Sequence, residues 1–150
     1  MFSNILLAVD GSDASMLAAR HGISLAKSLK AKLTAVVVTV PWATYFSREL
    51  AVIVPDALIP EAEYELKQNA MAENLLREVE SEARSAGVAV TKVHRSHRDP
   101  YCAILDVAEH DRCDAIVMAP HGERGLAGVL IGSETIRVLT HSKIPVLVHK

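Results

Sequence analysis

The chain has 150 residues, of which 50% are hydrophobic and 23% are charged, and this balance is typical of one folded domain over residues 1–150 rather than of a disordered segment. Its formal net charge is −2 at pH 7, from an even mixture of 16 basic and 18 acidic residues. Because contacts to the phosphates of a nucleic acid need clustered Lys and Arg, no nucleic-acid partner is expected.

Five short runs rich in apolar and β-branched residues are predicted as strands. Ile5 to Asp10 and Leu33 to Val40 have the composition of buried strands. Val88 to His94 is partly polar and is predicted to lie at a sheet edge. Ala115 to Met118 and Pro145 to His149 complete the set. Apolar runs of this kind favour a parallel sheet that is covered on both faces.

Longer segments with helical periodicity separate these strands, and each has a start or stop signal. In chain order, the predicted helices run from a cap at Ser12 or Asp13 to about Leu29, from Glu61 to about Ala86 before Gly87, from Pro100 to near Asp111, and from a cap at Ser133 to a point before Pro145. The buried faces of the first two helices are predicted to carry Met16, Leu17, Ala26 and Leu29, and Tyr64, Leu66, Leu75, Leu76, Val79 and Ala83.

The alternation of strands and helices predicts a three-layer α/β domain with right-handed crossovers. Sheets of this kind bind ligands beyond the carboxyl ends of their strands, at the point where the strand order reverses. The segments that follow the strands are therefore the candidates for a site. They are residues 10–13, 40–42, 97–100 and the stretch from Ala119 onward.

The segment from Pro41 to Pro60 is long for a connection between packed elements, and it contains Trp42, Tyr45 and Phe46. Two interpretations are open: a lid or partner surface, or a short helix that patches the core. Its apolar run is too short to cross a bilayer, and the N-terminal run of five apolar residues has no basic flank typical of a secretory signal. A cytoplasmic protein with no membrane partner is expected.

Cysteine and histidine residues give no metal or redox motif. Cys102 and Cys113 form no Cys-x-x-Cys pair and are expected to be buried, reduced thiols. His94 and His97 have the spacing of two metal ligands but no Cys or carboxylate pair beside them, so no metal site is predicted.

The stretch HGERGLAGVLIGSETIRVL, residues 121–139, combines glycines with the start of a helix. Glycine allows a ligand to approach the main chain, and a helix start offers unpaired N–H groups, so the amides of Ser133 and Glu134 could bind an anion. The alternative is a plain strand-to-helix loop. The stretch contains neither the P-loop pattern nor G-x-G-x-x-G.

The start, ILLAVDGSDAS, and the end, APHGERGLAGVLIGSETIRVLTHSKIPVLVHK, resemble the two ends of the universal stress protein family. The resemblance implies a doubly wound, five-stranded parallel sheet of strand order 3-2-1-4-5, the adenine nucleotide alpha hydrolase-like fold. It also implies a homodimer that pairs through the last strand, Pro145 to His149. An unpaired apolar edge supports this pairing, which we expect to involve Val146 and Val148.

The ATP-binding members of that family have the pattern Gly, two residues, Gly, nine residues, then Gly followed by Ser or Thr. Gly122, Gly132 and Ser133 match its later parts, whereas Ala119 replaces its first glycine. Further departures are Pro120, Glu123 and Arg98, of which Arg98 or Arg124 could offset the acidic charge. The resemblance implies adenine nucleotide contacts at Ala8, Val9, Asp10, Val40, Met118, Ala119, His121, Gly122, Gly132, Ser133 and Glu134.

Asp10 has two interpretations: a ligand for the ribose or adenine, as the resemblance implies, or a simple turn into the first helix. His121 could orient a water molecule or only pack the loop. The leading hypothesis is an ATP-binding regulatory module of the stress response, with or without Mg²⁺, that turns over ATP very slowly at most. The alternatives are a dimeric interaction module without nucleotide and, third, an adenylyl-transferring enzyme. The stress signal and the downstream partner are not predicted.

Overall fold

The structure is a computed structural model that describes residues 1–49, 59–122 and 131–150. Its centre is a parallel sheet of strands β1 (Asn4–Ala8), β2 (Lys32–Thr39), β3 (Val90–Ser96), β4 (Ala115–Met118) and β5 (Val146–Val148), in the order β3-β2-β1-β4-β5. This order confirms the doubly wound topology. The predicted first strand was too long at its end, because the ladder with β2 stops at Ala8.

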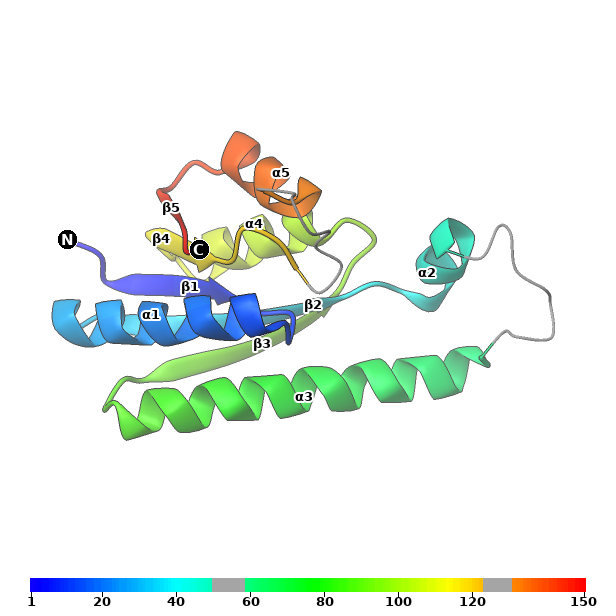
Figure 1. Cartoon of the computed structure of the whole chain (residues 1–150), viewed down its shortest axis with the longest axis horizontal. Helices are drawn as coiled ribbons and strands as arrows, with labels where there is room; N and C mark the ends of the chain where they lie inside the picture. Colours follow the sequence, from blue (N-terminus) through cyan, green and yellow to red (C-terminus); the bar gives the residue numbers. More distant parts are fainter. Residues whose placement is uncertain (50–58, 123–130) are drawn as a thin grey trace.

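Five helices surround the sheet in the described part of the chain: α1 (Asp13–Leu29), α2 (Trp42–Glu49), α3 (Glu61–Ser85), α4 (Pro100–His110) and α5 (Ser133–His141). Figure 1 shows α1 and α3 on one side of the sheet and α4 and α5 on the other. Side chains alternate along β1, so that Ile5 and Leu7 pack with α1 and α3 while Leu6 packs with α4 and α5. One hydrophobic cluster therefore lies on each face of the sheet, and helices, sheet and helices form three layers.

Most helix boundaries follow the predicted signals. Ser12 caps α1 by accepting a hydrogen bond from the Ser15 N–H at 3.1 Å, and α3 ends just before Gly87, which has a φ of +76°. The predicted cap of α5 is wrong. Gly132 is its N-cap and Ser133 is already its first helical residue, since the extended backbone at Gly132 lies one residue earlier than expected.

Two side chains that were predicted to be buried, Leu17 and Leu66, are exposed, and Leu29 and Leu75 are only partly buried. Leu17 is 44% exposed, because it lies about 100° around α1 from the buried Met16. Leu66 is 72% exposed, because it lies about 200° around α3 from the buried Tyr64. Cys102 is only partly buried, whereas Cys113 is buried. Burial raises the pKa of the Cys113 thiol, which keeps it in the neutral form.

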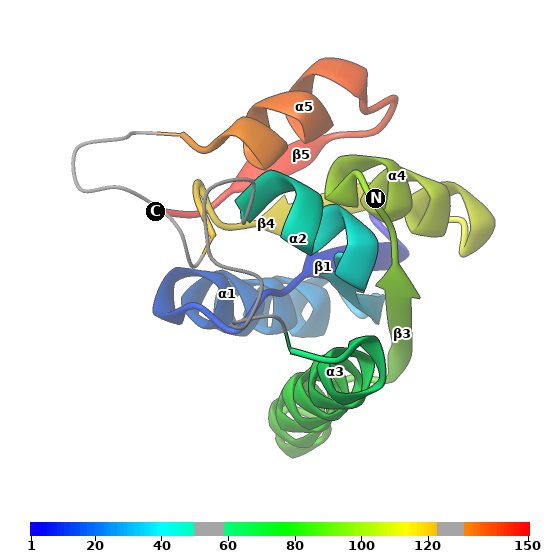
Figure 2. The same ribbon diagram turned by 90° about the vertical axis from the view of Figure 1, so that its right-hand side faces the viewer.

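The segment that follows β2 begins with α2, as in the second of its two interpretations. Its Trp42 ring donates a hydrogen bond from Nε1 to the Ile59 carbonyl at 2.8 Å, and the Tyr45 and Tyr64 ring centroids are 5.3 Å apart. Figures 1 and 2 place α2 beyond the carboxyl ends of the strands. Residues 50–58 are outside the described ranges, so a lid role stays a prediction. Within the described ranges, no helix combines the length and apolarity needed to span a membrane.

A network of polar side chains lies at the amino ends of the strands, opposite to the ends where α2 lies. The Asp114 carboxylate accepts hydrogen bonds from the N–H and hydroxyl of Ser3, both at 2.7 Å, and from the Asn4 N–H at 3.1 Å. The buried Asn4 amide in turn donates to the Asp111 carbonyl and to the Thr34 hydroxyl. These bonds connect the starts of β1, β2 and β4.

Replacing Asp114 with Asn is expected to lower the free energy of unfolding by about 1–2 kcal/mol at pH 7, because a charged acceptor in a partly exposed position is lost. Partial burial raises the pKa of the Asp114 carboxyl, but the hydrogen bonds from Ser3 and Asn4 outweigh it and hold the pKa below its ordinary value. The contribution is therefore present above about pH 4 and is lost as the pH falls through the folded-state pKa.

Urea unfolding at pH 7 and at about pH 2 measures this contribution. The stability difference between the wild type and Asp114→Asn should shrink at the acidic pH, whereas the matched control Asp106→Asn, at an exposed position of α4, should show little difference at either pH. An equal difference for Asp114→Asn at both pH values would refute the role of its charge.

Candidate functional site

The strand order reverses between β1 and β4, because the chain continues from β1 toward β2 on one side and from β4 toward β5 on the other. In doubly wound sheets a crevice opens at this point, beyond the carboxyl ends of the two strands. Two described segments meet there: the turn from β1 into α1, and residues 119–122, which follow β4.

Asp10 forms the turn from β1 into α1. Its Oδ1 accepts hydrogen bonds from the Ser12 N–H at 2.9 Å and the Ser12 hydroxyl at 2.7 Å, and its own N–H donates to the Ser15 hydroxyl at 3.3 Å. Gly11 has a φ of +89°, a backbone conformation that favours glycine. Asp10 therefore forms the turn into α1, as in one of its two interpretations, and its role as a nucleotide ligand stays a prediction.

The second oxygen of Asp10 faces Gly122. A Cβ atom added at Gly122 would collide with Asp10 Oδ2, so the end of β1 and the stretch after β4 approach each other as closely as a glycine permits. Space rather than a positive φ requires glycine at this position, because Gly11 and Gly87 are the positive-φ glycines of the described residues. Gly122 is itself exposed, which leaves its main chain accessible to a ligand.

Gly132 also lies close to the stretch after β4. Its N–H donates to the Pro120 carbonyl at 2.6 Å, and a Cβ added here would lie 3.4 Å from the His121 Cα. The Gly132 amide is thus engaged inside the protein and is not directed at a ligand. The hydrogen-bond ladder of α5 begins with the Ile136 N–H, which donates to the Gly132 carbonyl at 3.0 Å. The amides of Ser133 and Glu134 belong to the first turn, where a helix offers them no acceptor.

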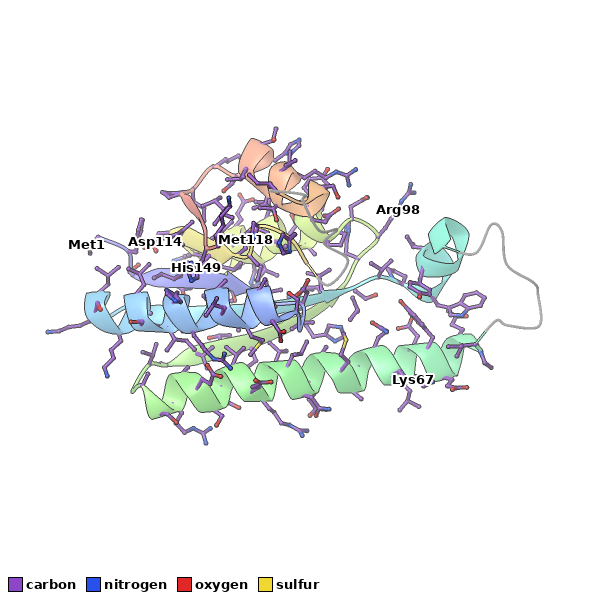
Figure 3. All side chains as sticks on the ribbon, in the orientation of Figure 1. Met1, Lys67, Arg98, Asp114, Met118 and His149 are labelled. Atoms are coloured by element: carbon purple, nitrogen blue, oxygen red, sulfur yellow. The ribbon has the colours of Figure 1, made fainter. Side chains whose placement is uncertain are left out.

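Ala119 and Met118 are core residues. Each is 6% exposed, with Ala119 packed on the α1 and α3 side of the sheet and Met118 on the α4 and α5 side; Figure 3 labels Met118. Lys30 and Arg112 are the non-glycine residues with positive φ in the described ranges, so the methyl group of Ala119 causes no backbone strain. The Ala119 carbonyl accepts a hydrogen bond from the buried Thr135 hydroxyl at 3.1 Å, which fixes α5 to the end of β4.

The remaining apolar candidates lie at the carboxyl ends of β1 and β2. Val9 is 4% exposed and its N–H donates to the Val36 carbonyl at 3.0 Å, while Ala8 is half-buried at the end of β1. Val40 lies one residue beyond β2, and its carbonyl accepts a hydrogen bond from the Tyr64 hydroxyl at 2.7 Å. The Tyr64 contact was not predicted, because its partner is distant in sequence.

Glu134 lies at the start of α5, but its carboxylate is directed at α4. It accepts hydrogen bonds from the Tyr101 N–H at 2.9 Å and from Arg137 at 3.3 Å. The Asp99 side chain, at the N-cap of α4, makes no capping hydrogen bond, so Glu134 satisfies an amide of that helix instead. The acidic residue therefore supports α4, and only its main-chain N–H remains a candidate for ligand contact.

Arg98 lies at an exposed position just before α4. Its side chain is 74% exposed, lies 4.0 Å from the Asp99 carboxylate, and extends outward in Figure 3. Compensation of the Glu123 charge by Arg98 or Arg124 stays a prediction, because the position of that charge is not described. Glu123 and Arg124 lie outside the described residues. Among the described residues, the half-buried His121 and the exposed Ser133 are the polar residues adjacent in sequence to Gly122 and Gly132.

Comparisons with known proteins give one consistent result. The family model described as the universal stress protein family matches residues 1–150. The universal stress protein MJ0531 of Methanocaldococcus jannaschii is 32% identical, over 100% of this chain and 83% of its own length. The structure of the hypothetical protein MJ0577 superposes with a TM-score of 0.80 at 27% identity, covering 99% of this chain and 95% of the other.

A universal stress protein solved in complex with cAMP has the same fold, with a TM-score of 0.70 at 24% identity over 99% of this chain and 97% of the other. The family match covers the whole chain, and the solved structures named above share its fold over nearly the whole chain. The chain belongs to the universal stress protein family.

Proposed function

We propose that this chain binds an adenine nucleotide, ATP in the first place, where β1 and β4 end, and that it works as a regulatory module of the stress response. The observation that carries the proposal is the contact between Gly122 and the Asp10 carboxylate. It brings together two segments more than a hundred residues apart in the sequence, at the edge where doubly wound sheets bind nucleotides.

The phosphates are assigned to the start of α5. The first-turn amides of Ser133 and Glu134 and the exposed Ser133 hydroxyl supply donors, and the positive end of the helix dipole favours an anion. The Glu134 carboxylate, held by Tyr101 and Arg137, is directed away and leaves the amide end open. Mg²⁺ would supply additional positive charge to the phosphates, but none of the protein contacts above depends on it.

The sugar and base are assigned to the end of β1. Asp10 Oδ2 can accept hydrogen bonds from ribose hydroxyls or from an amino group, while Val9 and Val40 supply an apolar wall. A universal stress protein of the same fold has been solved in complex with cAMP, which supports an adenine nucleotide as the ligand. Calorimetric titration should show binding of ATP and weaker binding of GTP, and silence at millimolar ATP would contradict the proposal.

A regulatory role is proposed rather than turnover. Transfer of a phosphoryl group needs a positioned nucleophile and cationic groups that stabilise the developing charge. Among the described residues, His121 and Ser133 are the polar neighbours of the two glycines in sequence, and neither His nor Ser supplies the fixed positive charge that such a transfer needs. Hydrolysis of ATP is therefore expected to be slow at most. A cytoplasmic location remains part of the proposal.

One observation favours the second candidate function, a dimeric interaction module without nucleotide. The Gly132 N–H is hydrogen-bonded to Pro120, so the last glycine of the motif contributes no donor. This candidate predicts the same dimer but no effect of ATP on stability. Thermal unfolding with and without ATP separates the two, because a ligand that binds only the folded state raises its stability.

The homodimer is proposed to form through β5. The hydrogen bonds between β5 and β4 indicate which main-chain groups of β5 are available for pairing with a second copy. The Pro145 carbonyl accepts from the Ile116 N–H at 2.9 Å, and the His149 N–H donates to the Met118 carbonyl at 3.0 Å. Residues 145, 147 and 149 therefore direct their main-chain groups at β4. Since these groups alternate along a strand, Val146 and Val148 direct theirs at the open edge.

A second copy can pair with this edge in an antiparallel way about a twofold axis at Leu147. Val146 of each copy would then exchange hydrogen bonds with Val148 of the other, and the two Leu147 side chains would be direct neighbours. Leu147 is 47% exposed, and Ile136 and Leu139 on α5 are 51% and 42% exposed. These side chains supply the apolar surface that a dimer would bury.

A further inference from the structure

A groove of about 340 Å³ lies between α1 and the edge strand β5. Its lining includes His21, Gly22 and Leu25 from α1, Val117 from β4, and Leu147 and His149 from the last residues of the chain. The groove shares no residue with the contact between Asp10 and Gly122. In Figure 3 the labelled His149 lies beside α1.

His149 carries an unusual nitrogen atom. Its Nε2 is buried and has no hydrogen-bond partner, which makes it the one such side-chain atom found across residues 1–49, 59–122 and 131–150. The main chain of His149 is held in place by the hydrogen bond from its N–H to the Met118 carbonyl at 3.0 Å. A buried polar atom without a partner in a native protein calls for an explanation, of which a bound water or a bound ion are the usual ones.

The imidazole of His21 lies directly over that of His149. The two ring centroids are 3.7 Å apart and the ring planes are tilted by 44°. The neighbouring Gly22 makes this approach possible, because a Cβ at that position would collide with the Leu7 side chain and push α1 away from the sheet. His21 is exposed, so its ring can rotate about χ1 and χ2 while His149 stays in place.

From this arrangement we infer that His21 and His149 form a two-histidine site for a divalent transition-metal ion. Imidazole nitrogen is a preferred ligand of Zn²⁺, Cu²⁺ and Ni²⁺, and the unpartnered Nε2 of His149 supplies the first ligand. Rotation of the exposed His21 ring would supply a second nitrogen to the same ion, at the usual zinc–nitrogen distance of about 2.0–2.1 Å. Water in the groove completes the coordination, and the lining residues include no Lys or Arg that would repel a cation.

The two histidines lie outside any larger ligand cluster, because the described residues contain no group of three or more His, Cys, Asp or Glu side chains that could hold a metal. The site therefore keeps open coordination positions. This geometry fits reversible binding of an ion at the edge of the molecule and not a structural ion required for folding.

The test is calorimetric titration of the full-length, EDTA-treated protein with ZnCl₂ and, separately, with NiCl₂. One ion per chain should bind to the wild type, and His149→Gln and His21→Gln should each weaken it at least about tenfold. The matched control is His110→Gln, which removes an exposed histidine that has Asp111 2.7 Å away. It should leave the tight site unchanged. Because His21 is exposed, its variant tests the site even if His149→Gln folds poorly.

A second readout uses the ring signals of the histidines in NMR spectra. Paramagnetic Ni²⁺ at substoichiometric amounts should broaden the signals of His21 and His149 before those of the other histidines. Wild-type affinity in both variants, no binding at all, or preferential broadening of another histidine would each overturn the site. The nitrogen of His149 would then be assigned to a water molecule.

Discussion

Replacing Gly122 with aspartate is expected to lower the affinity for ATP roughly 100-fold, which corresponds to about 2.7 kcal/mol. Any Cβ at this position collides with Asp10 Oδ2, and the new carboxylate would add a second negative charge beside the first. The Asp10 side chain would have to leave the turn that it forms with Ser12, and the added charge would repel the phosphates. Calorimetric titration with ATP measures the effect.

Two further variants separate the causes of this loss. Gly122→Ala introduces the collision without the charge and should fall between the wild type and Gly122→Asp. Ser81→Asp adds the same charge at an exposed position of α3, near the opposite edge of the sheet, and should bind ATP like the wild type. Circular dichroism checks that all variants fold. Unchanged ATP binding in folded Gly122→Asp would show that the nucleotide does not bind where β1 and β4 end.

Replacing Leu147 with glutamate is expected to raise the dissociation constant of the homodimer at least about 100-fold. In the proposed pairing the two Leu147 side chains are direct neighbours, and burying a leucine contributes roughly 1.5–3 kcal/mol. The variant removes this contribution from both copies and places two like charges opposite each other. Light scattering coupled to size-exclusion chromatography should find a dimer for the wild type and a monomer for the variant at micromolar concentration.

Leu17→Glu is the matched control for this variant. Leu17 is 44% exposed, close to the 47% of Leu147, but it lies on α1 and not at the sheet edge. The control should remain a dimer, because a general loss of apolar surface is not the proposed cause. A monomeric wild type, or a Leu147→Glu variant that dimerises as tightly as the wild type, would refute pairing through β5.

The sequence was sufficient to locate the five strands and the helices α1, α3, α4 and α5, because continuous apolar runs and strong capping signals recur along the chain. The helix α2 was only one of two open interpretations of its segment. The sequence was less reliable where two neighbouring residues compete for one role. Ser133 is a better cap by preference than Gly132, but the bond of the Gly132 N–H to Pro120 sets the extended backbone one residue earlier. The strand order 3-2-1-4-5 came from the resemblance, since periodicity alone does not order parallel strands.

The candidate site was only partly predictable for a related reason. The importance of Asp10 and Gly122 followed from their positions after strands, but their mutual contact depends on how β1 and β4 pair in space. The direction of the Glu134 side chain toward the Tyr101 N–H depends on the packing of α5 against α4. Contacts between residues that are far apart in the chain leave no local signal, and the structure is needed to find them.

The most direct test of the central claim is chemical identification of what the freshly purified protein carries. Denaturing the protein and analysing the supernatant by chromatography and mass spectrometry should release an adenine nucleotide in wild-type samples and much less from Gly122→Asp. Supernatants without adenine nucleotide, from protein that also fails to bind added ATP, would contradict nucleotide binding by this chain.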